Sequence, residues 1–209
     1  MDAAIFDCDG TLVDSEPLAR RAWERTLAGH GYEVTDDDFA EVTGLPFETV
    51  HGYFAERASL PPSGPVWREY SGGLFELIDA AARPFPDALE TLDELTRARV
   101  PVAIASSSSR ERLDRTLSAA GLDGRVGVTV AGDEIARGKP APDLFLSAVE
   151  RLGARPERCV IVEDAAPGVE AGLAAGATVV AVAREPRERS RLERAHRVVE
   201  RLSVAALSL

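Results

Sequence analysis

Short apolar runs that alternate with helical segments constrain the fold of this chain more than any other feature. Four runs follow one another after residue 84, each separated from the next by a segment of helical periodicity: 100–105, 126–131, 159–162 and 178–183. Because these runs are continuously apolar, both faces of each strand must be covered, which is typical of a parallel sheet between layers of helices. The run at 3–6 must join the same sheet, since a lone strand is not stable. The pattern predicts an α/β protein with a doubly wound parallel sheet.

A second region of the chain has a different pattern, with no strand signal between residues 14 and 81. Helices are predicted there at 14–29, from 36 onward, at 47–58 and at 66–81, with a loop at 61–65. Because this region follows the first strand, we expect residues 15–81 to form an inserted helical bundle, a cap domain. Residues 1–14 and 82–209 would then form the core, with hinges near 13–16 and 81–85.

Composition and charge exclude several classes of protein. The chain has 209 residues, 45% of them hydrophobic, which is enough for a substantial core. Its net charge of -11 argues against general affinity for nucleic acid, whose phosphate backbone attracts basic proteins. No stretch approaches the roughly 18 consecutive apolar residues of a membrane span, and the early first strand leaves no room for a signal peptide. Cys8 and Cys159 make no disulfide framework, which favours a cytoplasmic protein, and no obligate protein partner is evident.

Polar and charged residues follow the predicted strands at the point where each strand ends. Acids follow the first strand, serines the second, a lysine lies in the loop after the third, and acids follow the fourth: Asp7 and Asp9, Ser106–Ser109, Lys139, and Glu163 with Asp164. Ligands bind beyond the carboxyl ends of the strands in doubly wound sheets. The sequence therefore predicts one site that combines four acids, several hydroxyls and an ammonium.

Asp7 and Asp9 are two residues apart at the end of a strand, so their side chains are expected to point to the same side. Paired carboxylates in this position can hold a hard divalent cation such as Mg²⁺. They can also divide the roles of nucleophile and acid-base catalyst. A solvated acidic turn after an edge strand is the alternative interpretation. The acids at the other strand end favour a chemical site.

Lys139 is the only lysine among the 24 lysine and arginine residues of the chain. Lysine differs from arginine where a compact ammonium has to approach an anion as a point charge, so we expect Lys139 to be functional. The four acids alone would repel an anionic substrate, whereas a divalent cation would reverse the local charge. Lys139 and Ser106 could then hold phosphoryl oxygens while Asp7 attacks phosphorus. Asp9 could protonate the leaving group and later deprotonate water.

The chain resembles haloacid-dehalogenase-superfamily phosphatases of the branch that has a helical cap after the first strand. The resemblance covers nearly the whole chain and rests on four motifs in order, at Phe6–Ser15, Ala105–Ser107, Gly138–Pro140 and Val162–Ala165. The segment Glu163–Ala171 is especially similar to sugar-phosphate phosphatases and β-phosphoglucomutases. For the fold, the resemblance implies a Rossmann-like core with an inserted cap.

The resemblance also implies an activity, which is Mg²⁺-dependent hydrolysis of a small phosphorylated metabolite through an aspartyl phosphate. It implies the following residues: Asp7 as nucleophile, Asp9 as acid-base catalyst, Ser106, Ser107 and Lys139 as ligands of the substrate phosphate, and Asp7, the Asp9 backbone carbonyl and Asp164 as Mg²⁺ ligands, with Glu163 nearby. Substrate specificity is expected in the cap, around residues 15–18 and 44–47.

Two positions depart from the β-phosphoglucomutase pattern. Such chains carry a histidine shortly after the first motif and an arginine in a cap loop, where this chain has Ala19 and Phe47. We therefore expect hydrolysis, with a phosphosugar mutase as the alternative. A dehalogenase would lack the second acid, Asp9, and a phosphonoacetaldehyde hydrolase would need a lysine in the cap. A receiver-like signalling domain, the non-enzymatic alternative, shares the acids and the lysine but has no cap.

Other charged segments are expected to have structural roles. Asp36–Asp38 is predicted to cap the start of a helix and to complement its dipole. His30, His51 and His196 lack ligand spacing and are expected in turns or on the surface. The segment Arg184–Arg201 alternates arginine with glutamate, which predicts a solvated, ion-paired surface segment.

Overall fold

The computed structural model describes residues 1–42, 45 and 47–208 of the chain. The chain divides into two compact units. The larger unit consists of Met1–Asp14 and Arg83–Leu209, and the smaller unit is Ser15–Ala82. The two boundaries fall at the two ends of the helical insertion, and Ala82 belongs to the helical unit.

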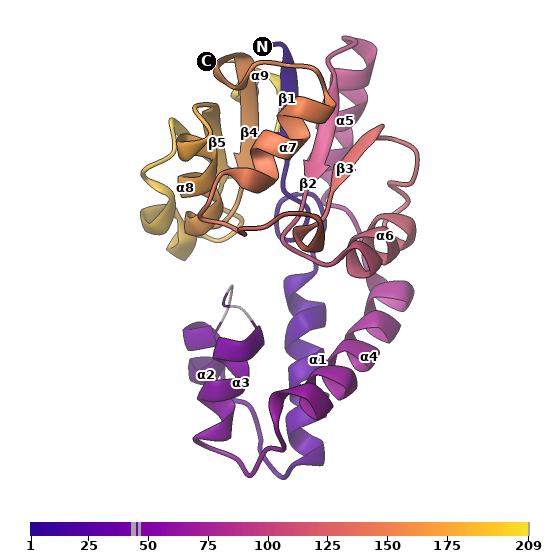
Figure 1. Ribbon diagram of the computed structural model, residues 1–209, viewed down its shortest axis with the longest axis vertical. Helices are drawn as coiled ribbons and strands as arrows, with labels where there is room; N and C mark the ends of the chain where they lie inside the picture. Colours follow the sequence, from indigo (N-terminus) through magenta and orange to yellow (C-terminus); the bar gives the residue numbers. More distant parts are fainter. Residues whose placement is uncertain (43–44, 46, 209) are drawn as a thin grey trace. The chain divides into compact units, whose positions relative to one another are not determined.

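The larger unit is built on a parallel sheet, in which the described residues form six strands in the order β3-β2-β1-β4-β5-β6. Figure 1 labels β1 to β5. The strands are β1 (Ala3–Phe6), β2 (Val102–Ala105), β3 (Val128–Val130), β4 (Cys159–Glu163), β5 (Thr178–Val182) and β6 (Arg197–Val199). β1 and β4 are neighbours and are buried along their whole length. Because side chains on both faces are covered, the strands have to be continuously apolar. The predicted doubly wound α/β fold is confirmed.

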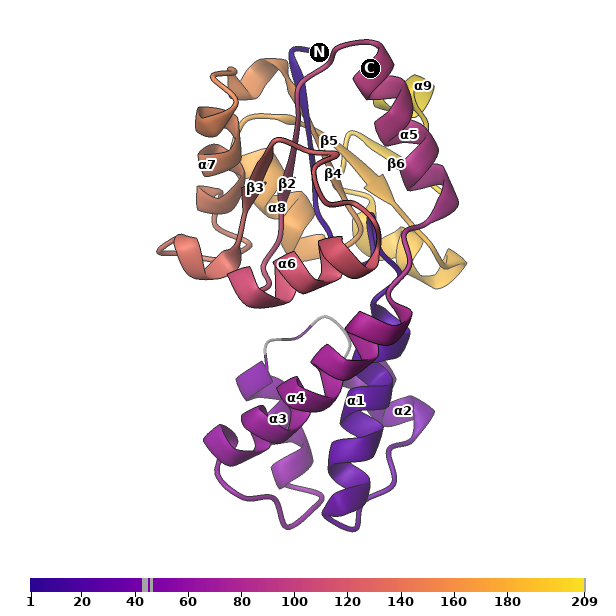
Figure 2. The same ribbon diagram turned by 90° about the vertical axis from the view of Figure 1, so that its right-hand side faces the viewer.

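Helices cover both faces of this sheet. They are α5 (Pro86–Arg97), α6 (Arg110–Ala119), α7 (Asp143–Arg151), α8 (Ala166–Ala174) and α9 (Val204–Leu207), with short 3₁₀ segments at Gly132–Glu134, Pro156–Arg158 and Pro186–Leu192. α5 and α7 lie on opposite sides of the sheet (Figure 2). Under α7, Leu144 and Phe145 pack in one apolar cluster with Ile5 and Ile161 of the central strands. This burial of apolar surface holds the carboxyl ends of β1 and β4 next to each other.

The smaller unit is built from helices in the part of it that the structure describes. Its helices are α1 (Glu16–Gly29), α2 (Asp36–Val42), α3 (Phe47–Ala55) and α4 (Ser63–Ala81). α1 and α4 lie side by side (Figure 1). Between them, the ring of Trp23 stacks on Tyr70 with 4.5 Å between centroids and on Phe47 with 5.5 Å. Aromatic stacking therefore contributes to a separate core for the cap unit.

Several element boundaries differ from the sequence prediction. α4 begins at Ser63, inside the segment predicted as a loop, because Pro65 lies in the first helical turn, where a backbone N–H has no partner within the helix. α3 ends at Ala55 rather than at residue 58. Residues 43, 44 and 46 lie outside the described residues, and two of them, 44 and 46, belong to the expected specificity loop at 44–47.

The prediction of a solvated surface segment at Arg184–Arg201 is wrong in part. Its residues Arg197–Val199 form β6, which pairs in parallel with β5, and Leu192 is buried. A strand of three residues is too short to show periodicity, and the frequent charges of the segment hide it. His196, within this segment, is exposed as expected, and its Nδ1 accepts a hydrogen bond from the Val179 backbone N–H.

The acidic triplet lies in the first turn of α2, as predicted. Thr35 precedes the helix, and its hydroxyl accepts from the Asp38 backbone N–H at 3.1 Å, while the Asp38 carboxylate accepts from the Thr35 N–H at 2.9 Å. Thr35 and Asp38 therefore form a capping box at the start of α2. None of the helices in the described parts of the chain is both long enough and apolar enough to cross a membrane.

Candidate active site

The turn after β1 places two acids at the carboxyl edge of the sheet. The Asp7 backbone N–H donates to the Val162 carbonyl of β4 at 2.9 Å, which fixes the end of β1 against its neighbour. Gly10 then adopts a φ of +80°, a backbone conformation that residues other than glycine rarely adopt. The Gly10 N–H donates to the Val13 carbonyl at 2.8 Å and closes the turn.

Lys139 connects the ends of β1 and β4. Its Nζ donates to Asp7 Oδ1 at 2.5 Å and to Glu163 Oε1, and all three side chains are at most 8% exposed. The other carboxylate oxygen of Glu163 accepts from the backbone N–H groups of Asp164 at 2.9 Å and Ala165 at 3.0 Å. Glu163 thus holds both the ammonium and the start of the loop that carries Asp164. Both of its oxygens are engaged by groups of the protein itself.

Asp9 lies in a different set of contacts. Its Oδ2 accepts from the hydroxyls of Ser108 at 2.8 Å and Ser106 at 3.3 Å, and Arg112 of α6 donates to Oδ1 at 2.9 Å. The structure therefore brings Ser106 to Asp9, as the strand-end argument expects. Ser108 belongs to the predicted serine run. Arg112 was not predicted, because it is 103 positions from Asp9 in the chain and no local pattern indicates that contact. Ser107 is exposed.

Asp164 faces the turn after β1. Its Oδ1 accepts from the Thr11 hydroxyl at 2.9 Å, and Thr11 is fully buried. A Cβ on Gly10 would overlap the Asp164 carboxylate, so this position requires glycine for space as well as for conformation. The acids of β1 and β4 are therefore set close together by direct contact between their two loops.

Burial and like charges shift the protonation of this site. Burial raises the pKa of Asp7 to about 8, against the opposing effect of Lys139 and together with that of Glu163. Burial, Glu163 and Asp7 raise the pKa of Asp164 well above its usual value. Burial by itself would lower the pKa of Lys139, but the Asp7 and Glu163 carboxylates raise it. The site has more carboxylates than its cations balance, which is the electrostatic condition that a bound divalent cation relieves.

The donor chemistry of these residues fits Mg²⁺, which prefers oxygen ligands. In the described ranges, no three acidic, histidine or cysteine side chains are spaced as a complete metal site. The ligand set implied by the resemblance contains a backbone carbonyl, that of Asp9, in addition to the carboxylates of Asp7 and Asp164. Such a mixed set does not require three converging side chains.

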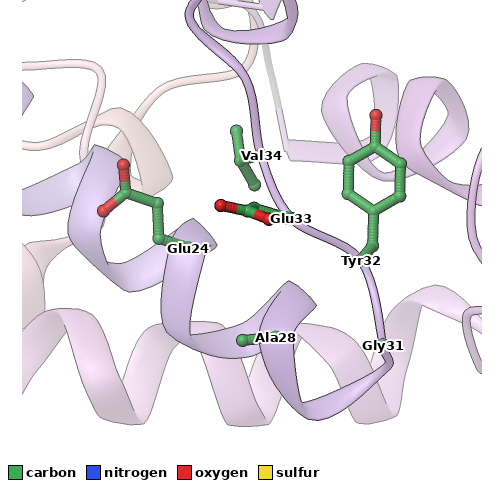
Figure 3. Close-up of a pocket in the computed structure, with 6 residues that line it drawn as sticks. All are labelled: Glu24, Ala28, Gly31, Tyr32, Glu33 and Val34. Atoms are coloured by element: carbon green, nitrogen blue, oxygen red, sulfur yellow. The ribbon is translucent and has the colours of Figure 1, made fainter.

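The helical unit contains none of these acids. Phe47, one of the two positions that depart from the mutase pattern, packs in the aromatic cluster of the cap, 4.8 Å from Trp67 and 5.5 Å from Trp23 between ring centroids. Ala19 is half-buried on α1. A hollow of about 560 Å³ lies between α1 and the segment that follows it (Figure 3), lined by Glu24, Ala28, Gly31, Tyr32, Glu33 and Val34. It contains no predicted site residue.

Comparison with known proteins gives a consistent result. The model of the haloacid dehalogenase-like hydrolases matches residues 1–176. Hexitol phosphatase A of Escherichia coli is 36% identical over 182 residues, which cover 85% of this chain and 81% of that protein. The chain spans only 18% of a longer relative, the chloroplastic protein SUPPRESSOR OF QUENCHING 1 of Arabidopsis thaliana, which is 37% identical over 189 residues.

Two solved structures are similar over nearly the whole chain. A hydrolase of this family from Deinococcus radiodurans, solved with phosphate and sodium bound, is 36% identical, has a TM-score of 0.78, and is matched over 95% of this chain and 90% of its own. A protein from Thermotoga maritima described as a β-phosphoglucomutase is 28% identical, has a TM-score of 0.81, and is matched over 95% and 94%. With its acid pair, lone lysine and second acidic loop on the parallel sheet, the chain belongs to the haloacid dehalogenase-like hydrolases.

Proposed function

We propose that this hydrolase removes phosphate from a small phosphorylated carbohydrate or polyol through an aspartyl-phosphate intermediate. The observation that carries the proposal is the position of Asp7, a buried carboxylate in direct contact with the only lysine of the chain. A buried carboxylate beside a fixed ammonium can attack phosphorus while the ammonium neutralises phosphoryl oxygens.

In the first step, an Asp7 carboxylate oxygen forms a bond to phosphorus and the ester P–O bond breaks. Asp9 donates a proton to the leaving alkoxide. In the second step, Asp9 takes a proton from water, the resulting hydroxide attacks the same phosphorus, and the acyl phosphate bond breaks to release phosphate and Asp7. Lys139 and Ser106 would hold phosphoryl oxygens in both steps. Because Ser106, Ser108 and Arg112 occupy the Asp9 carboxylate, proton transfer requires one of these contacts to be exchanged for the substrate.

Mg²⁺ is part of this proposal. Asp7, Asp164 and the Asp9 backbone carbonyl would hold the ion, and it would supply positive charge that draws the phosphate to an otherwise anionic site. Glu163 would act from outside this set, because its oxygens hold Lys139 and the N–H groups of Asp164 and Ala165. Its role would be to orient the ammonium and the Asp164 loop.

Two observations support a carbohydrate or polyol substrate and a hydrolytic outcome. The relative with 36% identity is a hexitol phosphatase, whereas the structurally similar protein described as a mutase is 28% identical. Phe47, at the position where mutase-like chains carry arginine, is committed to aromatic packing within the cap. It cannot donate a charged hydrogen bond to a second phosphate.

A cytoplasmic location is proposed from the two cysteines, Cys8 and Cys159, which are both free and buried.

A panel of sugar and polyol monophosphates, with free phosphate as the readout, tests the proposal. We expect Mg²⁺-dependent release by the wild type and none above background by Asp7→Asn, which is nearly isosteric but not a competent nucleophile. Asp123→Asn, an exposed aspartate of the same unit, is the matched control and should retain full activity. Circular dichroism should show the same fold for all three proteins. Activity of Asp7→Asn near the wild-type level would falsify the aspartyl-phosphate mechanism, and failure of the wild type on the whole panel would reject the substrate class.

A further inference from the structure

Arg184 reaches the catalytic turn from a part of the chain that was expected to be a solvated surface segment. It follows β5 by two residues, and its side chain is only 16% exposed. The guanidinium donates to the Thr11 backbone carbonyl at 2.6 Å and to the Gly10 backbone carbonyl at 3.4 Å. An arginine with these contacts holds the backbone of the turn and leaves the turn's side chains free for other partners.

The guanidinium is itself fixed by its surroundings. Arg184 Nη1 donates to both oxygens of Asp87, at 3.0 and 2.7 Å, and Asp87 is buried. Asp87 Oδ2 also accepts from the Leu202 backbone N–H at 2.7 Å. The guanidinium carbon lies 3.8 Å from the centroid of the Phe85 ring, a cation–π contact. The start of α5 and the C-terminal segment therefore determine where the Arg184 donors point.

The turn that Arg184 holds is the one that contacts Asp164. The Thr11 hydroxyl donates to Asp164 Oδ1 at 2.9 Å. The same carboxylate lies so close to Gly10 that a Cβ there would overlap it. If the backbone of Gly10 and Thr11 moved, the Asp164 carboxylate would lose both its hydrogen bond from Thr11 and its packing contact with Gly10. Groups that hydrogen-bond to metal ligands fix the orientation of those ligands, and their loss typically lowers metal affinity or activity by about 10- to 100-fold.

We propose that Arg184 is a positioning residue that holds the Gly10–Thr11 backbone so that Asp164 is presented correctly to Mg²⁺. The inference rests on the proposed function, which assigns Asp164 as a Mg²⁺ ligand. It extends that site to the end of β5 and, through Asp87, to the start of α5. The proposal assigns Arg184 no direct contact with the substrate or the ion, and its effect passes through Thr11.

Magnesium binding without substrate provides the test. The dissociation constant for Mg²⁺ alone is measured by calorimetric titration of metal-free Arg184→Met, Arg184→Lys and wild-type protein. Loss of an orienting group typically weakens metal binding by about 10- to 100-fold, and this is the loss we expect for Arg184→Met. Arg184→Lys keeps the charge but cannot span a carboxylate and two carbonyls, so we expect an intermediate loss. It also serves as the informative variant if Arg184→Met does not fold.

Arg201→Met is the matched control. Arg201 lines the same small hollow as Pro86, Asp87 and Arg184, but its side chain is 75% exposed and its ion pair with Glu90, at 4.0 Å, is long. Hydrogen exchange of residues 8–13 in metal-free protein gives a second readout, and we expect faster exchange in the Arg184 variants alone.

The Mg²⁺ dissociation constant decides the outcome. A weakening of about threefold or more in the folded Arg184 variants, absent from Arg201→Met, supports the proposal; a smaller change, or an equal change in Arg201→Met, overturns it. A wild type that does not bind Mg²⁺ also overturns it. If the wild type binds Mg²⁺ but hydrolyses no phosphate ester, the proposed function fails. The ratio of the Mg²⁺ dissociation constants of variant and wild type then still tests the role of Arg184. If hydrolysis is confirmed and the ratio is unchanged, only the role of Arg184 fails.

Discussion

The ammonium of Lys139 lies 2.5 Å from Oδ1 of Asp7, although the two residues are 132 positions apart in the chain. Both side chains are 8% exposed, so the pair is removed from water. Taking two charges out of water is costly unless each finds close partners, and Lys139 has a second one in Glu163. A compact ammonium can satisfy two carboxylates at once where a planar guanidinium needs more space.

Lys139→Arg should lower kcat strongly while the protein remains folded. The substitution keeps the charge but places a wider, planar group between Asp7 and Glu163, so the donors can no longer reach the phosphoryl oxygens correctly. Loss of one well-placed donor in a comparable anionic site costs about 100- to 1,000-fold in kcat, and we expect a loss in this range. Steady-state kinetics of phosphate release measures it.

Arg137→Lys is the matched control for this exchange. Arg137 lies two residues before Lys139, its side chain is 72% exposed, and it pairs with Asp143 on the surface. We expect kcat within about twofold of the wild type, because exposed ion pairs contribute little. Normal turnover by Lys139→Arg would mean that lysine was not retained at this position for chemistry.

Gly168→Ala should impair the site from behind. A Cβ at Gly168 would overlap the Glu163 carboxylate, which holds Lys139 and the Asp164 loop. We expect the displacement to destabilise the protein by about 1–3 kcal/mol, as overpacking of a close contact does, and to lower kcat as well. Thermal unfolding and phosphate release measure the two effects separately.

Gly73→Ala provides the contrast for this prediction. Gly73 lies within α4, and a Cβ there would meet nothing within 4 Å. Replacing a helical glycine by alanine should stabilise the protein by about 0.5–1 kcal/mol without changing kcat. If Gly168→Ala behaved like Gly73→Ala, the close packing of Gly168 against Glu163 would have no functional consequence.

The cap unit should lose stability in acid through Asp38. Burial alone would raise the pKa of this carboxyl, but hydrogen bonds from Thr35, Tyr53 and Tyr32 lower it to about 2. A group with a lowered folded-state pKa stabilises fully above its unfolded value, near 4, and the contribution is lost as the pH falls toward 2. Both tryptophans of the chain, Trp23 and Trp67, lie in this unit, so tryptophan fluorescence reports its unfolding.

Asp38→Asn should therefore destabilise the cap unit at neutral pH by about 1–3 kcal/mol and remove most of its stability change between pH 4 and pH 2. Asp37→Asn is the control, because Asp37 is the exposed neighbour in the same helical turn. It should leave both the midpoint and the acid dependence close to those of the wild type. Equal behaviour of the two variants would contradict the structural role of Asp38.

A direct competition should separate hydrolysis from phosphosugar isomerisation. A mutase must protect its aspartyl phosphate from water and hold a second phosphate, and neither Ala19 nor Phe47 provides a charged group for this. Incubation with β-glucose 1-phosphate and a trace of glucose 1,6-bisphosphate should release free phosphate faster than it forms glucose 6-phosphate. Accumulation of glucose 6-phosphate as the faster product would show that another residue does the work of the missing arginine, and the mutase interpretation would replace ours.

Much of the fold and part of the site could be predicted from local patterns. Continuous apolar runs require strands covered on both faces, and covered parallel strands bring their carboxyl ends to one edge. This argument alone predicts that Asp7, Lys139 and Glu163 meet, and the structure shows all three in contact. β6 was not predicted, because a strand of three residues within a charged segment has no periodic signal.

The sequence by itself determined the sheet, the helical insertion and the set of charged groups at the strand ends, since these depend on the order of apolar and polar residues. Only the tertiary structure decided which partner each charge took. Asp9 forms an ion pair with Arg112, whereas Asp7 pairs with Lys139. Arg184 donates hydrogen bonds to backbone carbonyls of the turn after β1 instead of facing solvent. Such contacts depend on the directions of side chains carried by elements far apart in the chain. Those directions are set by how helices pack on the sheet, which no local pattern encodes.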